Sequence, residues 1–355
     1  KKYFFMGLGV GYYARNPIRG KAGLSSLFSI GHFKIVNQTL LAPMAGVTDL
    51  PFRKICREMG AGLVVSEMVA ADPKCWRTRK SNLRTRFDEE PAPRSVQIVG
   101  YDPKEMADAA KYNVDRGAEI IDINMGCPAK KVCRRDAGSA LLREPKLVEK
   151  ILTEVTKTVS APVTLKIRTG WDPMSRNTAL IAKIAENSGI SALAIHGRTR
   201  QCRFSGKAEY ESISLAVSTV NIPVIANGDI ETPRQASDVL KKTGAAAVMI
   251  GRAALGKPWI FRDFENSLPN GTPSHRLLQS EKNEIINRHL RAIHSFYGET
   301  QGVRIARKHI GWYLREIPLG RGFTRHFNSL DAAQSQIDAL TEFFKDNDSF
   351  RDRAA

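Results

Sequence analysis

Eight short runs of strand-favouring apolar residues recur along this 355-residue chain, and each is followed by a stretch that permits a helix. The runs cover residues 40–43, 63–66, 95–98, 120–124, 163–167, 192–196, 223–227 and 247–250. Regular alternation of strand and helix is typical of parallel strands joined by right-handed crossovers. Eight such repeats predict the α/β class and a closed (β/α)8 TIM barrel, with a doubly wound open sheet as the alternative.

Alternation within the strands predicts which polar side chains enter the barrel. In the run 163–167, Thr164 and Lys166 alternate with apolar residues that should face the helices, so both should point inward. The same reasoning turns Gln97, Asn124 and His196 inward. Because TIM barrels carry their active sites at the C-terminal ends of the strands, we expect the chemistry where these polar residues converge.

The alternation stops after Trp259, and the rest of the chain predicts a small helical domain. Three helices are expected, over 277–296, 303–317 and 330–344, separated by Gly and Pro. The predicted parts are a disordered N-terminal extension over 1–30, a barrel over 31–264 and a helical domain over 265–355. The extension lacks Asp and Glu, so an organellar presequence is the alternative for it.

A formal net charge of +18 at pH 7 predicts a polyanionic partner, because Lys and Arg bind phosphates and release condensed counterions. Residues 276–325 alone hold ten Lys or Arg against four acids, although a solvated charged face is the alternative for any one helix. The five cysteines form no CxxC pair and no zinc-like spacing, and no apolar run has membrane-spanning length. We therefore expect a cytoplasmic protein without a membrane segment or a bound metal.

The segment 121–139, Ile-Asp-Ile-Asn-Met-Gly-Cys-Pro-Ala-Lys-Lys-Val-Cys-Arg-Arg-Asp-Ala-Gly-Ser, is the most specific in the chain. Cys127 follows the fourth predicted strand, where Gly126 and Pro128 shape a turn that can present its thiol at the barrel mouth. A free cysteine is more often a small buried hydrophobe, and this is the interpretation we give to Cys133. At a strand end between Gly and Pro, Cys127 is the candidate catalytic residue.

This segment resembles the signature of the tRNA-dihydrouridine synthases, and the resemblance extends from about residue 40 into the C-terminal helices. It implies that Cys127 is the catalytic acid and that a further set of residues binds a flavin. In that set, Pro43, Met44 and Ala45 match the segment beside the isoalloxazine edge, Gln97, Lys166 and His196 match other flavin contacts, and Asn227, Gly228, Asp229, Gly251 and Arg252 match the ribitol and phosphate contacts.

The resemblance also implies a reaction. NADPH reduces bound FMN, and reduced FMN passes a hydride to C6 of a uracil ring in tRNA while Cys127 protonates C5. The uridine should be flipped out of the folded tRNA to reach a concave site. The stretches 42–46, 124–131 and 304–309 are most similar to the bacterial B subfamily, which implies a uridine of the D-loop, expected at position 17. We expect a monomer.

Each assignment also has a physical basis. A Lys inside a barrel is costly to bury without an anion, so Lys166 should face the reduced flavin or, as the alternative, pair with Asp122. His196 alone could be a hydrogen-bonded core histidine. Arg252 could hold a phosphate, although a Gly-Arg dipeptide alone is weak support. The loop 72–86 surrounds Trp76 with basic residues, which fits either an RNA contact or a solvated loop.

Two other functions stay open at the level of sequence. One is an FMN barrel that acts on a free pyrimidine, as dihydroorotate dehydrogenases do; the basic C-terminal helices argue against it. The other is a non-enzymatic RNA-binding or regulatory protein on a barrel scaffold. The presence of Cys127, Lys166 and the phosphate-site residues argues against that second alternative.

Overall fold

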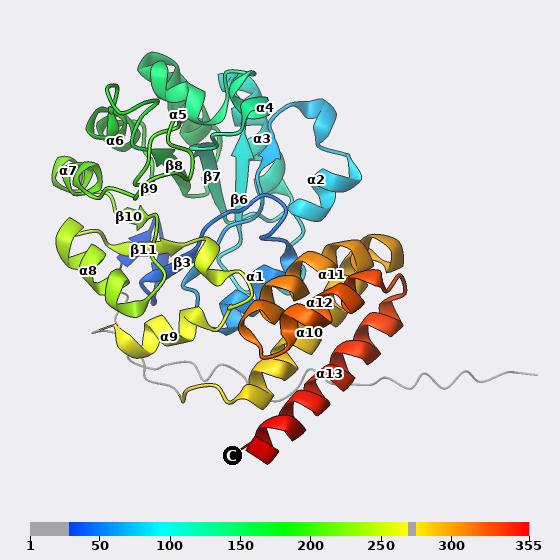
Figure 1. The fold of residues 1–355 in the computed structure, drawn as a ribbon. Helices are drawn as coiled ribbons and strands as arrows, with labels where there is room; N and C mark the ends of the chain where they lie inside the picture. The colour runs from blue at the N-terminus through cyan, green and yellow to red at the C-terminus, as the bar shows by residue number, and fades with distance from the viewer. Residues whose placement is uncertain (1–27, 269–274, 355) are drawn as a thin grey trace, which may run out of the picture.

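The computed structural model describes residues 28–268 and 275–354, which form a barrel of parallel strands with a group of helices packed against one side (Figure 1). Most of the predicted N-terminal extension, residues 1–27, lies outside the described residues. Its last three residues form strand β1 (Phe28–Ile30). No helix in the described part of the chain is long and apolar enough to cross a bilayer.

The strands close into a ring, as predicted. Their order is β4 (Leu63–Val64), β3 (Thr39–Leu41), β11 (Ala247–Ile250), β10 (Val224–Asn227), β9 (Ala192–His196), β8 (Val163–Arg168), β7 (Ile120–Met125), β6 (Ser95–Val99) and β5 (Val69–Ala70).

Two features show that this sheet is a barrel. Strand β3 pairs in parallel with both β4 and β11, so the first and last strands of the ring are neighbours. The predicted second strand is split into β4 and β5, and Val65 between them bridges Ser95 of β6. The TIM barrel is therefore confirmed and the doubly wound open sheet is wrong, because an open sheet leaves its end strands apart.

Helices cover the outside of the ring (Figure 1). They are α1 (Leu50–Glu58), α3 (Pro103–Asp115), α5 (Pro145–Thr158), α6 (Thr178–Asn187), α7 (Glu211–Thr219), α8 (Pro233–Thr243) and α9 (Ile260–Ser267). Two short helices, α2 (Arg79–Arg84) and α4 (Lys130–Cys133), lie in the loops that follow β5 and β7. Several of the outer helices start at a side-chain cap followed by Pro, as α3 does at Asp102 and α8 does at Thr232. Val163, Leu165 and Ile167 are buried in the large apolar core.

A hairpin closes the N-terminal end of the barrel. Strands β1 and β2 (Phe33–Ile35) pair antiparallel, and Ile30 and Ile35 are fully or almost fully buried. Both belong to an apolar cluster with Leu40, Ile120 and Ile225, which lie on three strands of the ring. Since this end is filled with apolar side chains, the interior of the barrel is open to a ligand at the opposite, C-terminal end of the strands.

The C-terminal helices number four in the described residues: α10 (Gln279–Tyr297), α11 (Glu299–Tyr313), α12 (Gly320–Ser329) and α13 (Ala333–Ala354). Helix α12 was missing from the prediction because its two glycines resemble a break in the chain. Tertiary packing stabilises α12 despite its low helix propensity. Phe327 is buried, and the ring of Phe323 stacks on Phe343 of α13 at 4.3 Å between centroids.

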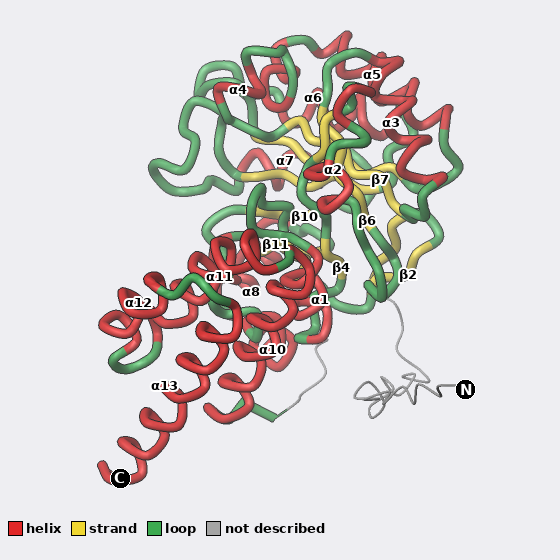
Figure 2. The backbone as a smooth tube through the Cα atoms, turned by 90° about the vertical axis from the view of Figure 1, so that its right-hand side faces the viewer, coloured by secondary structure: helices red, strands yellow, loops and turns green. Residues whose placement is uncertain are grey.

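The helical region shares its core with the barrel. Figure 2 shows α10 beside α1, and Ile286 and Leu290 of α10 belong to the same apolar cluster as Phe52 of α1. Tyr297 Oη also donates to Asp49 Oδ2 at 3.0 Å across this interface. The predicted domain boundary after residue 264 falls inside α9 rather than between elements.

Gly256 provides a test of how tightly the two regions fit. Its φ is +68°, and an added Cβ would lie 2.4 Å from the carbonyl carbon of Trp312 in α11. We expect Gly256→Ala to lower the free energy of unfolding by more than the roughly 1 kcal/mol that backbone strain alone costs. Gly244→Ala is the matched control, because Gly244 has a similar φ of +69° and the nearest atom to its added Cβ, Val217 Cγ1, lies at an ordinary contact distance of 3.4 Å. Equal shifts of the urea midpoint in the two variants would contradict the close fit.

Candidate active site

A cavity of about 730 Å³ opens at the C-terminal ends of the strands. Side chains from most strands of the ring and from the loops that follow them line it. All the residues that the sequence singled out for the site lie in this lining: Pro43, Met44, Ala45, Gln97, Cys127, Lys166, His196, Asn227, Gly228, Asp229, Gly251 and Arg252. The structure therefore brings them together, while their individual roles stay predictions.

A chain of amide hydrogen bonds crosses the floor of the cavity. The carboxylate of Asp122 accepts from Thr164 Oγ1 and from Gln97 Nε2, both at 2.6 Å. Gln97 Oε1 in turn accepts from Asn124 Nδ2 at 2.8 Å. Burial raises the pKa of Asp122 to about 6, although the hydrogen bonds from Thr164 and Gln97 oppose this rise. The inward orientation predicted for Gln97, Asn124 and Thr164 is confirmed by these contacts.

The turn that carries Cys127 is held from three sides. Asn124 Oδ1 accepts from the backbone N–H of Cys127 at 2.9 Å, and Ser139 Oγ donates to the Cys127 carbonyl at 2.8 Å. Arg168 Nε donates to the Gly126 carbonyl at 2.9 Å. Burial raises the pKa of the Cys127 thiol above its usual value, so the group is protonated at neutral pH. Cys133 is buried beneath this turn.

Lys166 is a half-buried cation that forms no ion pair with a carboxylate of the described residues. Its Nζ donates to Asn227 Oδ1 at 3.1 Å, and among the described residues no carboxylate oxygen lies within the 4.0 Å of an ion pair. Burial, with a smaller effect of Arg168, lowers the pKa of Lys166 to about 8. The alternative, a direct ion pair with Asp122, does not form, because the Asp122 oxygens accept from Thr164 and Gln97. Asp122 affects Lys166 only as a nearby charge that favours its protonated form. A free ammonium in this place can pair with an anionic ligand.

The part of the cavity formed by the loops after β9, β10 and β11 carries paired charges. Asp229 accepts from Arg198 Nη2 at 2.6 Å and from Arg252 Nη2 at 3.2 Å. Burial, assisted by Lys166 and other nearby cations, lowers the pKa of His196 to about 2, so this imidazole is neutral. Its Nε2 lies 3.3 Å from Arg198 Nη1. His196 faces the cavity, so it is not the hydrogen-bonded core histidine that the sequence left as an alternative.

Two buried arginines of the site were not predicted. Arg168 is the last residue of β8, and Arg198 follows β9 by two positions; both line the cavity. The alternation along the strands could have identified both, because Arg168 lies two residues beyond Lys166 and Arg198 two residues beyond His196, and both of those residues were predicted to point inward. The predicted strand ended at Ile167, one position too early for the alternation to include Arg168.

The lining carries an excess of positive charge. Its cations are Lys130, Lys166, Arg168, Arg198, Arg203 and Arg252, and its acids are Asp229 and Glu231. Such an imbalance in a partly desolvated cavity favours an anionic ligand. Phosphate, or a flavin ring that carries negative charge when reduced, fits this donor set.

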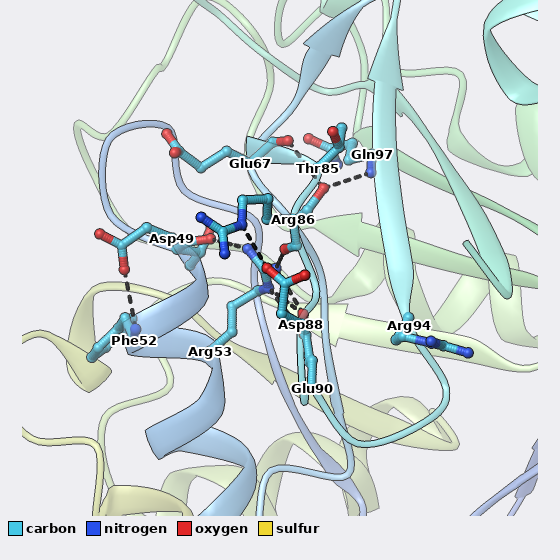
Figure 3. A network of polar contacts seen from close by, with 12 residues as sticks. Asp49, Phe52, Arg53, Glu67, Thr85, Arg86, Asp88, Glu90, Arg94 and Gln97 are labelled. Atoms are coloured by element: carbon cyan, nitrogen blue, oxygen red, sulfur yellow. Dashed lines mark hydrogen bonds and ion pairs between the residues drawn. The ribbon is translucent and has the colours of Figure 1, made fainter. Parts of the chain in front are cut away.

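The segment 43–49 carries one edge of the cavity, lined by residues 43–45 and 47, and α1 with its neighbours holds the rest of the segment (Figure 3). Arg53 of α1 forms a fully buried ion pair with Glu90 at 2.7 Å and donates to the carbonyls of Thr48 and Arg86. The carboxylate of Glu67 accepts from the backbone N–H of Gly46. The cavity edge is thus tied to the barrel by ionic hydrogen bonds that are strong in a buried setting.

The loop 72–86 differs from an open RNA-binding surface in one respect. The ring of Trp76 stacks on Tyr112 of α3 at 4.5 Å between centroids, and its indole N–H donates to the Ala71 carbonyl at 3.0 Å. One face of the indole is therefore already covered. The solvated-loop interpretation gains support at Trp76, while Lys74, Arg77 and Lys80 remain exposed cations.

Comparison with known proteins gives the family. The sequence model for dihydrouridine synthase matches residues 40–348. The tRNA-dihydrouridine synthase B of Pseudomonas syringae pv. tomato is 55% identical over 319 residues, which are 90% of this chain and 95% of the relative. The protein of the same name from Escherichia coli K12 is 55% identical over 316 residues, which are 89% of this chain and 98% of the relative. With a matching signature around Cys127 on a TIM barrel, this chain belongs to the dihydrouridine synthase family of enzymes.

Proposed function

We propose that this enzyme is a tRNA-dihydrouridine synthase that uses FMN and NADPH to reduce a uridine in the D-loop of tRNA to 5,6-dihydrouridine. The observation that supports this proposal best is the joint position of Cys127 and Lys166 in one cationic cavity at the C-terminal ends of the strands. The similarity to B-type relatives makes position 17 the expected uridine. A monomer in the cytoplasm remains our prediction.

The lining fits FMN. Lys166, with its unpaired ammonium, would lie against the anionic edge of the reduced ring, and Gln97 and the neutral His196 would contact the rest of it. Pro43, Met44 and Ala45 would cover its other edge. The ribitol and phosphate would lie against the segments 227–229 and 251–252, where Arg252 has an exposed guanidinium. FMN reduced by NADPH supplies the hydride that adds to C6 of uracil.

Cys127 supplies the proton that completes the reduction. Saturation of the C5–C6 bond needs a hydride at C6 and a proton at C5, so the sulfur loses its proton and regains one from solvent before the next turnover. Because burial raises the thiol pKa, Cys127 holds this proton at neutral pH. Asn124, Ser139 and Arg168 hold the Cys127 turn in place, so the sulfur can meet the same ring atom in each turnover.

The tRNA body would be held by the helical region. A groove of about 440 Å³ lies on α11 and α12 and is lined by four cations and an indole; its lining is Arg307, Lys308, Gly311, Trp312, Arg315, Arg321, Thr324 and Asn328. Cations around a partly exposed indole suit the phosphates and bases of RNA. An FMN barrel that acts on a free pyrimidine would have no use for such a groove.

The proposal is tested by incubating the purified FMN-loaded protein with NADPH and tRNA that lacks dihydrouridine, followed by mapping of the modified uridines. We expect dihydrouridine in the D-loop and no reduction of free uracil or orotate. Formation of no dihydrouridine, or reduction of the free pyrimidine alone, would refute the proposal.

The acid role of Cys127 gives the first prediction from this function. Cys127→Ala should keep FMN and its reduction by NADPH but slow dihydrouridine formation by about 100-fold or more, the usual contribution of a general acid. Single-turnover mixing of the pre-reduced enzyme with tRNA measures this step. Cys75→Ala is the matched control, because Cys75 lies in the loop outside the cavity lining. An unchanged single-turnover rate in Cys127→Ala would reject the role.

The groove gives the second prediction. The double variant Arg315→Ala, Arg321→Ala should weaken tRNA binding, because each guanidinium that contacts a phosphate releases a counterion. We expect the slope of log Kd against log salt to fall by about two, with reduction of FMN by NADPH unchanged. The control is Lys157→Ala, Lys241→Ala, which removes the same charge from exposed positions on α5 and α8. An equal loss of tRNA affinity in both double variants would mean that net charge, not the groove, binds the tRNA.

A further inference from the structure

Phe204 is an exposed aromatic residue at the mouth of the cavity. Its side chain lines the same cavity as Cys127, yet the residue is 56% exposed. It belongs to the loop that follows β9, in which Arg203 and Lys207 are exposed as well. A single exposed apolar side chain is common on a protein surface, so the exposure of Phe204 gains meaning only from its place in the lining of the active-site cavity and from the contacts that hold it there.

Two buried cations hold the loop on both sides of Phe204. Arg168 is 2% exposed, and its Nη1 donates to the Arg203 carbonyl at 2.7 Å. Arg198 is 4% exposed, and its Nη2 donates to the Gly206 carbonyl at 2.6 Å. Hydrogen bonds from buried guanidinium groups are strong. The ring of Phe204 is therefore held at the entrance by its backbone rather than left there by a loose loop.

Positive charges flank the ring. The Cζ atoms of Arg168 and Arg252 each lie 5.4 Å from the centroid of Phe204, within the range of a cation–π contact. Because the residue is still 56% exposed, its ring leaves a surface on which a nucleobase can stack, and the guanidinium groups beside it supply charge for a phosphate. The same pair of features would have little value for a small neutral ligand.

We propose that Phe204 stacks against the base of a nucleotide next to the uridine that is reduced, and so helps to bind and orient the tRNA. This inference rests on the proposed function. The reduced ring itself must reach the Cys127 thiol, which is less exposed than Phe204, so the base on Phe204 belongs to a neighbouring nucleotide that stays at the mouth. Stacking accepts any base, so this contact orients the strand without reading its sequence.

The test compares Phe204→Ala and Phe204→Trp with the wild-type holoenzyme. Loss of one stacked base should raise the Kd and the KM for tRNA about tenfold in Phe204→Ala. We expect Phe204→Trp to restore both values, and single-turnover reduction of saturating tRNA to change much less than KM. Met174→Ala is the control, because Met174 is an apolar side chain, 95% exposed, on the loop after β8. It should leave the Kd for tRNA unchanged.

Three outcomes would overturn the inference. An unchanged Kd for tRNA in Phe204→Ala would show that no base stacks there. Slower reduction of FMN by NADPH at an unchanged Kd for tRNA would assign the ring to the nicotinamide, and loss of bound FMN would assign it to the flavin. A wild-type enzyme that forms no dihydrouridine would refute the proposed function as well, so the two failures are distinct.

Discussion

The buried carboxylate of Asp122 determines how the amide side chains between it and Cys127 are oriented. Its oxygens accept from Thr164 and from Gln97 Nε2, so the Gln97 carbonyl oxygen must face the other way. That oxygen accepts from Asn124 Nδ2, which leaves Asn124 Oδ1 for the backbone N–H of Cys127. At pH 7 the carboxylate is ionised, although its pKa is raised to about 6, and an ionised carboxylate only accepts. The direction of every bond up to the Cys127 turn follows from this one acceptor.

The cations around the cavity divide by what their donors contact. Arg168 donates to backbone carbonyls and so holds loops in place, while Arg198 donates to the Gly206 carbonyl and also forms an ion pair with Asp229. Lys166 donates to the neutral amide of Asn227, and much of its charge is left for a ligand. Arg252 shares Asp229 with Arg198 but keeps its guanidinium half in solvent. The buried guanidinium groups of Arg168 and Arg198 therefore fix the positions of loops, while Lys166 and Arg252 are available to bind an anionic ligand. Because most of these cations already have hydrogen-bond acceptors, several of them can lie in one cavity.

The barrel and the inward side chains of its strands could be predicted from the sequence because both follow from alternation along the strands. That rule turned Gln97 and Lys166 inward, and the hydrogen bonds of the structure agree. The lining residues beyond the strand ends, such as Met44, Asp229 and Arg252, were assigned through the family resemblance. Arg168 was missed because a strand end cannot be located to one residue when polar side chains begin there. The stacking partner of Trp76 lies on α3, far away in sequence, so no local pattern could reveal it. Helix α12 likewise depends on the contact of Phe323 with another helix.

The segment 43–49 connects the two functional regions of the molecule. It lines the cavity, and the carbonyl of Gly46 accepts from Lys308 of α11. Lys308 also lines the groove on α11 and α12, so one side chain touches both the proposed RNA surface and the cavity edge. Tyr297 of α10 holds Asp49 at the other end of the segment. Truncation before α10 would remove these contacts and expose Phe52, which stacks on His289. The helical region is therefore part of the structure that shapes the cavity.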